Sequence, residues 1–367
     1  SGMCCGTSEN SYKTIADIRI IMSDGTILDT ADQESRESFT KSHSFLLKGL
    51  EKLAEEIDSN EILREKIKQK YKIKNTTGYS LNAFTDFKDG FEILKHLIIG
   101  SEGTLAFISD ITYKTVIEYK DKALALAIYP DIEQACTAVT ILKSAPVTAV
   151  EIMDRAALRS VESTKGVPGY LKSLAPNSTA LLIETKAKND EELNKNVSYI
   201  ENSISNIHTV TPLCFTKDPT EQAILWKIRK ETLPTVAGMR RSGTTSIIED
   251  VCFPVPSLAK AVLDLQALFS KHGYDEAVIF GHALEGNMHF MFSPDFNNDV
   301  EFKRYSNFME ELADMVVEKY NGSLKAEHGT GRNMAPFVEK EWGKNALTIM
   351  KEVKHLFDPK GILNPGV

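Results

Sequence analysis

The sequence contains no long apolar run and no excess of basic residues. None of its apolar stretches approaches the roughly 20 residues that a membrane-spanning helix needs. Acidic residues outnumber basic ones, 51 to 43 in 367 residues, which gives a formal net charge of −8. Proteins whose main partner is a nucleic acid carry basic surfaces instead. We therefore expect no nucleic acid among the partners of this protein.

Cysteine is scarce as well. The opening residues, SGMCCGTSEN, lack the basic start and the apolar core of a secretory signal. An odd number of scattered cysteines, two of them adjacent, indicates a reducing compartment rather than a disulfide framework. We expect a cytoplasmic protein, either free or peripheral on the inner face of the membrane. The five cysteines are Cys4, Cys5, Cys136, Cys214 and Cys252.

The pattern of apolar and polar residues along the chain predicts two lobes. Alternating apolar and polar residues on both sides of a Ser-Asp-Gly turn predict a β-hairpin over 15–30. Leucines at three- and four-residue spacing predict helices within 33–72, and a helix, a glycine loop and a strand follow over 92–116. From Lys122, strands and helices alternate through about two hundred residues, which predicts a second lobe, closed by a helical tail over 339–357.

The elements of the second lobe can be placed more closely. Strands are expected at 122–130, 179–187 and 276–284, with helices at 131–144, 258–273 and 302–322. The predicted fold class is α+β.

The glycine loop GSEGT at 100–104 is the first candidate binding element. Gly100 and Gly103 allow a ligand to approach the backbone closely, and Ser101 and Thr104 offer hydroxyls and amides to a phosphate or a ring edge. The loop is neither a Rossmann G-x-G-x-x-G nor a Walker loop, because no lysine follows its last glycine. A cofactor other than a Rossmann-bound nucleotide therefore has to be considered.

Four motifs, in this order and at these separations, carry a family resemblance. They are GSEGTLAFISDITYKT, FGHALEGNMHF, AEHGTGRNMAPFVEKEWG and LFDPKGILNPGV. Together they resemble the FAD-linked D-2-hydroxyacid dehydrogenases, a group of flavoproteins that includes D-lactate dehydrogenases, glycolate oxidase subunits and D-2-hydroxyglutarate dehydrogenases. The resemblance runs through essentially the whole chain.

The resemblance implies the architecture and the FAD contacts. Residues 1–118 would be the second part of a bipartite FAD-binding domain, 119–335 an α/β cap domain with a mainly antiparallel sheet that holds the substrate, and 336–367 a helical segment that returns to the FAD domain. The glycine-rich loop that wraps the FAD pyrophosphate in the family would lie upstream, so we expect this chain to be a fragment with an incomplete FAD pocket. The residues expected to contact FAD are Gly2, Gly100, Ser101, Gly103, Thr104, Ile108 and Asn364.

A divalent metal site is expected from a histidine pair. The apolar runs around ALEGN should pair as a hairpin, which would bring His282 and His289 close enough to bind one cation. A carboxylate from elsewhere would complete the site, and Glu327 is the candidate; Glu285 sits beside the turn and should point to solvent. Two histidines and one carboxylate suit zinc, and manganese is the other candidate. No H-E-x-x-H motif of metalloproteases is present.

The expected chemistry is oxidation of a 2-hydroxy acid. The hydroxyl proton needs a base that titrates near neutrality, as histidine side chains ordinarily do, so His328 is the candidate base. The substrate carboxylate needs a guanidinium; the resemblance favours Arg229, and Arg332, shortly after His328, is a further candidate. Arg240 and Arg241 are alternatives. Tyr79 and Asn82 in KNTTGYSLNAF would lie near the active-site face, for substrate contact or for packing.

Three functions stay open at this point. The first is FAD-dependent oxidation of a D-2-hydroxy acid, with D-lactate preferred; this fragment alone would be inactive. The second is a flavin-free hydrolase or lyase that uses the His282, His289 and Glu327 metal site. The third is a noncatalytic subunit of an oxidase complex. Besides a small 2-hydroxy acid, the candidate partners are an electron acceptor, a membrane surface and an iron–sulfur domain or subunit.

Overall fold

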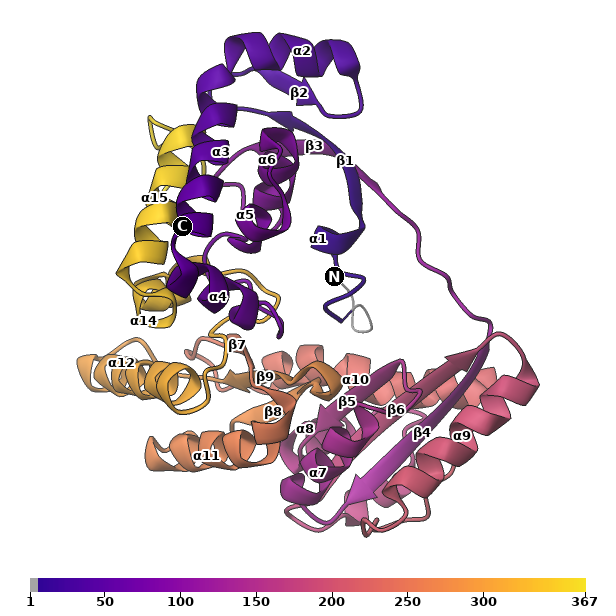
Figure 1. The fold of residues 1–367 in the computed structure, drawn as a ribbon. Helices are drawn as coiled ribbons and strands as arrows, with labels where there is room; N and C mark the ends of the chain where they lie inside the picture. Colours follow the sequence, from indigo (N-terminus) through magenta and orange to yellow (C-terminus); the bar gives the residue numbers. More distant parts are fainter. Residues whose placement is uncertain (1–5) are drawn as a thin grey trace. The chain divides into compact units, whose positions relative to one another are not determined.

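The computed structural model describes residues 6–367, which form two compact units. We call Ser1–Val116 with Ser323–Val367 the split unit, and Ile117–Gly322 the central unit (Figure 1). Each unit has its own apolar core. The chain leaves the split unit through residues 114–118, which are exposed and belong to neither a helix nor a strand.

The split unit contains a three-stranded antiparallel sheet in the order β2-β1-β3. Its strands are β1 (Ile15–Ile21), β2 (Ile27–Asp29) and β3 (Phe107–Tyr113). β1 and β2 form the hairpin predicted from Ser-Asp-Gly. Gly25 adopts φ +89° in that turn, where the Thr26 amide donates to Asp24 Oδ1.

Helices pack around this sheet as the leucine spacing predicted. Leu46, Leu50 and Leu53 of α3 are buried, and a Cβ on Gly49 would lie 2.8 Å from Leu356 of α15, so the two helices approach closely there. The helices of the split unit are α1 (Ser11–Thr14), α2 (Gln33–Ser42), α3 (Ser44–Ser59), α4 (Glu61–Lys70), α5 (Asn82–Asp86), α6 (Gly90–Ile98), α13 (Gly331–Met334), η5 (Ala335–Phe337), α14 (Val338–Trp342) and α15 (Lys344–Phe357).

Residues 323–335 belong to the split unit, whereas the sequence-based division placed them in the cap. The segment has little regular structure and is tied to residues 75–78 by hydrogen bonds. The Thr76 amide donates to the Lys325 carbonyl over 2.7 Å, and the Gly78 amide donates to Thr330 Oγ1 over 2.6 Å. These contacts join positions about 250 apart in the sequence, so no local pattern predicts them.

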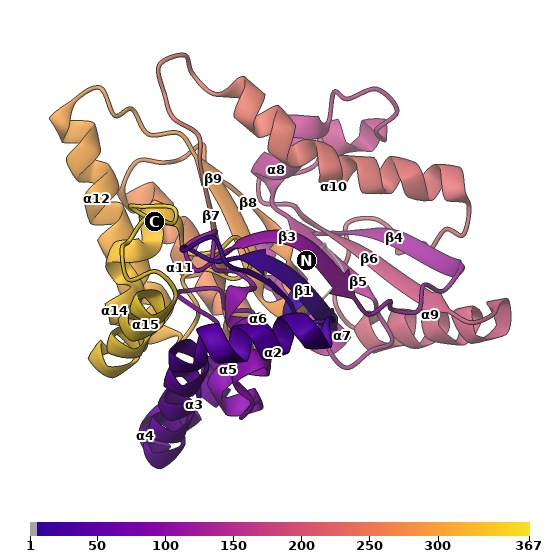
Figure 2. The ribbon, with the colours of Figure 1, turned by 90° about the horizontal axis from the view of Figure 1, so that it is seen from above.

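The central unit is built on a six-stranded sheet in the order β4-β6-β5-β8-β9-β7, and every neighbouring pair is antiparallel. This confirms the predicted α+β class with a mainly antiparallel sheet flanked by helices. Figure 2 shows α8 and α10 on one side of the sheet and α7, α9 and α11 on the other. The strands are β4 (Asp121–Tyr129), β5 (Ala149–Met153), β6 (Thr179–Ala187), β7 (Ile247–Cys252), β8 (Val278–His282) and β9 (Asn287–Phe292).

The helices of the central unit begin at polar caps in most cases. Asp131, Asp154 and Asn189 each accept a backbone amide of the first turn of α7, α8 and α9. The elements are α7 (Ile132–Leu142), α8 (Arg155–Val161), η1 (Gly169–Ser173), α9 (Asp190–Ile204), α10 (Pro219–Met239), η2 (Val255–Ser257), α11 (Leu258–Lys271), η3 (Ala283–Glu285), α12 (Asp299–Asp314) and η4 (Met315–Lys319).

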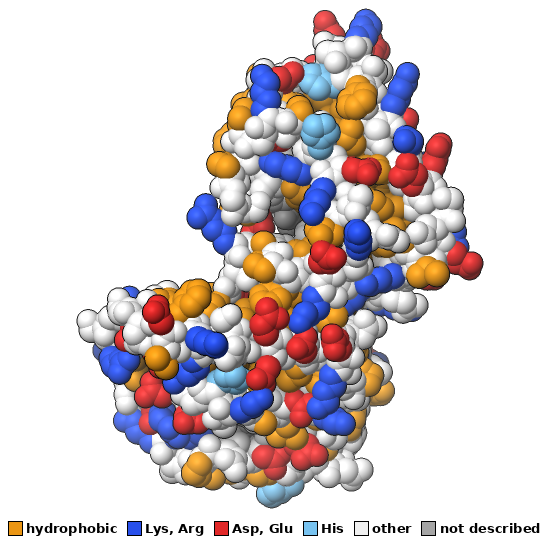
Figure 3. All heavy atoms as spheres, turned by 90° about the vertical axis from the view of Figure 1, so that its left-hand side faces the viewer, with side chains coloured by type: hydrophobic (Ala, Val, Ile, Leu, Met, Phe, Trp, Pro, Cys, Tyr) orange, Lys and Arg blue, Asp and Glu red, His pale blue; other side chains and the backbone are white. Residues whose placement is uncertain are grey.

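The surface mixes charges of both signs. Acidic and basic side chains are interspersed on the face shown in Figure 3. In the described part of the chain, no helix combines the length and the apolar character needed to cross a bilayer.

Candidate functional site

The central unit gathers ionisable side chains on one face of its sheet. Strand register places Glu151 opposite His282, and Asp250 opposite His289. His282 faces Asn287 and not His289, so the two histidines are diagonal neighbours on the same face. Their ring centroids are 5.0 Å apart in an edge-to-face arrangement, and both side chains are buried. The structure thus brings the expected histidine pair together.

Two glycines allow backbone segments to approach closely at the hairpin that carries the histidines. Gly286 adopts φ +70°, and a Cβ on it would lie 1.9 Å from the Phe253 carbonyl oxygen. A Cβ on Gly281 would lie 2.3 Å from the Asn287 carbonyl oxygen. Glu285 does not simply point to solvent as expected, because its carboxylate pairs with Lys143 Nζ at 3.0 Å.

Glu151 is the central residue of this cluster, and the sequence reasoning missed it. Its side chain is only 1% exposed. It accepts from His282 Nδ1 at 2.7 and 2.9 Å and from Arg229 Nε at 2.8 Å. A carboxylate that accepts from Nδ1–H fixes the imidazole tautomer and leaves Nε2 with the lone pair that a metal needs. The one available signal was an acidic residue inside the otherwise apolar strand AVEIM.

Arg229 is buried on α10, and its guanidinium carbon lies 4.8 Å from the centroid of the Phe280 ring. The ion pair with Glu151 uses Nε, so the terminal nitrogens are the ones that a substrate carboxylate could engage. The alternatives, Arg240 and Arg241, are exposed at the end of α10. The role of Arg229 in holding the substrate stays a prediction.

In the split unit, three residues of the GSEGT loop adopt left-handed backbone conformations. Gly100, Glu102 and Gly103 adopt φ of +81°, +53° and +71°. Ser101 and Thr104 are buried, and Thr104 Oγ1 donates to the Ser101 carbonyl at 2.6 Å and lies 2.8 Å from the Tyr79 hydroxyl. The Thr104 hydroxyl is therefore already hydrogen-bonded inside the unit, where the sequence had offered it to a cofactor.

The C-terminal tail returns to this loop. Asn364 Nδ2 donates to the Glu102 carbonyl at 2.6 Å, and the Glu102 carboxylate accepts from the Gly331 amide at 3.0 Å. Ile108 lies on the exposed strand β3. Gly2 lies outside the described residues.

A cavity of about 400 Å³ opens beside the loop within the split unit. Its walls include Tyr12, Lys74, Asn82, Gly100 and Glu327. Asn82 Oδ1 is buried without a hydrogen-bond partner among the described residues. Glu327 forms an ion pair with Lys74 at 2.7 Å, a contact that the sequence did not predict. The cavity thus combines an unsatisfied acceptor, a glycine backbone and the expected metal carboxylate.

The remaining predicted residues lie on the same C-terminal segment. The side chain of His328 is 39% exposed, and Arg332 is exposed, with its Nη2 at 3.5 Å from the Pro365 carbonyl oxygen. Glu327 and His328 belong to the split unit, whereas His282 and His289 belong to the central unit. The three-ligand metal site therefore stays a prediction.

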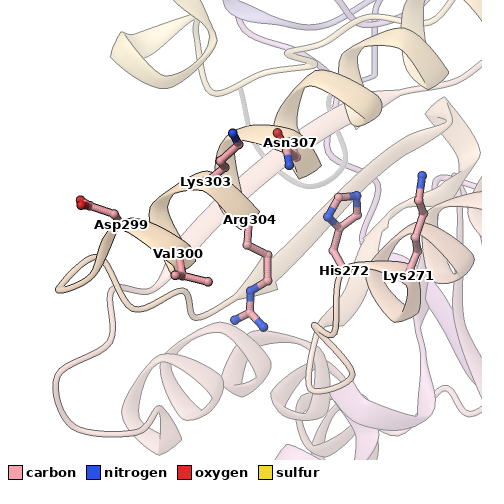
Figure 4. Close-up of a pocket in the computed structure, with 7 residues that line it drawn as sticks. All are labelled: Lys271, His272, Asp299, Val300, Lys303, Arg304 and Asn307. Carbon is pink, nitrogen blue, oxygen red and sulfur yellow. The ribbon is translucent and has the colours of Figure 1, made fainter.

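A separate recess on the central unit lies between the end of α11 and the start of α12 (Figure 4). Lys271 and His272 both face Glu311, and Arg304 pairs with Glu301. These charges are paired locally, and nothing in the recess resembles the histidine cluster.

A family model gives the class to which the chain belongs. Residues 118–367 match the family model described as FAD linked oxidases, C-terminal domain. The chain therefore belongs to the FAD-linked oxidases, which confirms the resemblance to the D-2-hydroxyacid dehydrogenases among them.

Curated relatives match about three quarters of the chain. The mitochondrial cytochrome-type D-lactate dehydrogenase of Arabidopsis thaliana is 31% identical over 74% of the chain and 47% of its own length. The glycolate oxidase subunit GlcD of Bacillus subtilis is 30% identical over 74% and 56%, and the D-2-hydroxyglutarate dehydrogenase of Stutzerimonas stutzeri is 27% identical over 80% and 60%. The chain thus spans about half the length of the curated relatives it matches.

Solved structures share the fold at low sequence identity. p-Cresol methylhydroxylase with bound substrate superposes with a TM-score of 0.60 at 12% identity, over 98% of this chain and 66% of that chain. The 4-ethylphenol oxidase from Gulosibacter chungangensis gives 0.59 at 13% identity with the same coverage.

Proposed function

We propose that this chain is the substrate-binding and part of the flavin-binding machinery of an FAD-dependent dehydrogenase that oxidises a D-2-hydroxy acid, with D-lactate preferred. Family membership supports FAD chemistry, and the names of the relatives all refer to hydroxy acids. The observation that carries the proposal is the buried cluster in which Glu151 joins Arg229 to the His282 and His289 pair.

The cluster suits a small acid with a hydroxyl next to its carboxylate. The terminal nitrogens of Arg229 would hold the carboxylate, while Glu151 keeps the guanidinium in place through Nε. The imidazole of His282 shares this carboxylate with the guanidinium, and the ring of His289 lies 5.0 Å from that of His282. The two imidazoles would lie beside the hydroxyl of a substrate whose carboxylate is held by Arg229. Such a compact arrangement favours a 2-hydroxy acid over a larger ligand.

The donor set fits a divalent metal such as zinc or manganese. Glu151 accepts from Nδ1 of His282, so Nε2 is the nitrogen that would bind the ion, and His289 lies beside it. Glu327 as the third ligand rests on the resemblance and on its acidic side chain. A bound metal would act as a Lewis acid on the substrate hydroxyl.

The split unit fits the flavin. The cavity beside Gly100 offers the unsatisfied Oδ1 of Asn82 to a ring N–H, and Tyr12 supplies an aromatic wall. Bound FAD would accept the hydride from C2 of the substrate. His328, partly exposed, would take the hydroxyl proton. A cytoplasmic or peripheral membrane location, and an electron acceptor or iron–sulfur partner, stay predictions.

The test uses the natural, FAD-loaded protein. Anaerobic stopped-flow absorbance would follow flavin reduction by D-lactate, with L-lactate, glycolate and D-2-hydroxyglutarate compared. We expect D-lactate to reduce the flavin fastest, and His328→Ala to slow that step about 10²- to 10⁴-fold, the usual contribution of a general base. His355→Ala, an exposed histidine on α15, is the matched control.

Metal content separates the remaining alternatives. Elemental analysis should find about one divalent ion per chain, and His282→Ala should lose it. Metal-dependent turnover in protein without flavin would replace the proposal with the flavin-free enzyme. A flavin that none of the hydroxy acids reduces would favour the noncatalytic subunit.

A further inference from the structure

Two adjoining cavities open on the central unit at the end of the sheet where β8 begins. They measure about 480 and 740 Å³ and share Ala156, Arg159, Tyr274, Asp275 and Ala277 in their walls. His282 lies at the other end of β8, about 13 Å further along at the rise of an antiparallel strand. The two cavities are therefore distinct from the histidine cluster.

Arginine is concentrated around these cavities. The chain has 43 basic residues, of which only ten are arginines, yet five arginines and no lysine line the two cavities. A guanidinium offers several donors in a fixed plane and suits phosphate and carboxylate groups better than an ammonium group does. In Figure 4 one of them, Arg304, leaves α12 in the direction opposite to Lys303, and its side chain lines the recess of that figure as well as one of the two cavities. The five are Arg155, Arg159, Arg240, Arg241 and Arg304.

Arg155 has buried donors that a polar ligand would satisfy. Its side chain is 8% exposed, and Nη2 pairs with Glu162 at 2.9 Å. Its Nε and Nη1 are buried and find no hydrogen-bond partner among the described residues. Buried donors of a charged group are costly to leave unpaired, so a ligand that reaches them gains the full benefit of the contact.

Arg159 is placed to bind the same ligand. It lies one helical turn after Arg155 on α8, in the wall common to both cavities. It is exposed and forms no ion pair within the described part of the chain. Its charge is therefore available to whatever enters either cavity.

Carboxylates also line the cavities, and two of them already accept backbone hydrogen bonds. Asp131 accepts the Gln134 amide at 2.8 Å, and Asp154 accepts the amides of Ala157 and Ile279 at 2.7 and 3.0 Å. Burial raises the pKa of Asp154 to about 7, which weakens its negative charge near neutrality. Asp275 and Glu276 are the exposed carboxylates of the rim.

We propose that the paired cavities bind a small molecule through its oxyanion groups, phosphate or carboxylate, with Arg155 and Arg159 as the principal contacts. The site is separate from the proposed substrate site at Arg229. It would let the central unit respond to an anionic metabolite without occupying the place of the substrate.

The test is calorimetric titration of the natural protein at constant ionic strength, with inorganic pyrophosphate in one series and succinate in another. We expect saturable binding of at least one probe. The probe that binds identifies whether the site takes a phosphate or a carboxylate group. Arg159→Ala should weaken that binding about 10- to 100-fold, the value of a charge-assisted hydrogen bond. Arg159→Lys should retain part of it, because the charge remains but the planar donor set is lost.

Two controls make the result specific. Lys172→Ala removes an exposed positive charge from η1, outside both cavities, and should bind like the parent protein. His282→Ala removes the proposed metal site and should also bind normally, so failure of the proposed function would not affect this result. The proposal is overturned if neither probe saturates, or if Arg159→Ala binds as tightly as Lys172→Ala.

Discussion

The ion pair between Glu151 and Arg229 is a buried charge pair whose loss should have a measurable effect on stability. Both side chains are less than a tenth exposed, and the Nε to Oε2 distance is 2.8 Å. Glu151 also accepts from His282. Replacing Glu151 by Gln keeps the shape of the side chain, removes its charge and leaves the guanidinium buried without a counter-charge.

The expected magnitude follows from that stranded charge. Removing one member of a buried pair typically costs about 3–5 kcal/mol, a large part of the stability of a domain. We expect Glu151→Gln to lower the free energy of unfolding of the central unit by this amount. Arg229→Met should cost less, because His282 can still pair with Glu151. The double variant buries no unpaired guanidinium, so the coupling energy should reach at least about 2 kcal/mol.

The two tryptophans make the assay selective for one unit. Trp226 lies in the central unit, where its indole donates to Glu184, and Trp342 lies in the split unit. In a Trp342→Phe background, urea unfolding followed by tryptophan fluorescence reports the central unit alone. All four members of the double-mutant cycle carry this change, so its own cost cancels.

A coupling energy below about 0.5 kcal/mol would refute the reasoning, because independent sites add within that limit. That outcome would mean that the pair is not formed in solution, and Arg229 would then lose its support as a positioned carboxylate-binding group. The slope of the free energy of unfolding against urea concentration must be the same for all four proteins, since a changed slope would mean that the unfolding transition itself had changed.

Two further predictions concern the same unit. Burial raises the pKa of Asp154 from 3.8 to about 7, so the folded state holds this proton more tightly than the unfolded state does. As the pH rises from about 4 to 7, the free energy of unfolding should therefore fall by up to about 1.4 kcal/mol per pH unit, and it should level off above pH 7. Urea titrations should show that Asp154→Asn loses this slope, and parallel pH profiles for the parent protein and the variant would contradict the prediction. Gly286→Ala forces a Cβ against the Phe253 carbonyl at φ +70°. This change should lower the melting temperature more than Gly166→Ala, where φ is +90° but nothing lies within 4 Å of the added Cβ. Equal decreases in melting temperature would show that backbone strain alone matters.

Local patterns predicted the elements of the fold because each depends on neighbouring residues. The hairpin over 15–30 follows from one Ser-Asp-Gly turn, and the helices within 33–72 follow from leucine spacing. The hairpin that carries His282 and His289 follows from apolar runs on both sides of a glycine turn. Even there, the diagonal placement of the two histidines depends on register, which the sequence left unspecified.

The features that were missed depend on residues far apart in the sequence. Glu151 lies in a strand that is buried on both faces, so no alternation marks its side, and its partner Arg229 is 78 positions away. The contact between the hydroxyls of Thr104 and Tyr79 joins residues 25 positions apart and was not inferred from spacing. The end of the central unit at Gly322 is likewise set by contacts of the next residues with 75–78.

The fold alone does not choose the substrate, and our proposal of a hydroxy acid rests on the side chains of the cluster. Two solved structures of this fold are named for p-cresol and 4-ethylphenol, which are phenols without a carboxylate. A buried guanidinium would cost such a site desolvation energy without a charge to bind. Arg229 is buried all the same, and Glu151 neutralises it through Nε while its terminal nitrogens remain for a second anion. Our proposal of a hydroxy acid over a phenol therefore rests on this arginine, and the double-mutant cycle tests the contact that positions it.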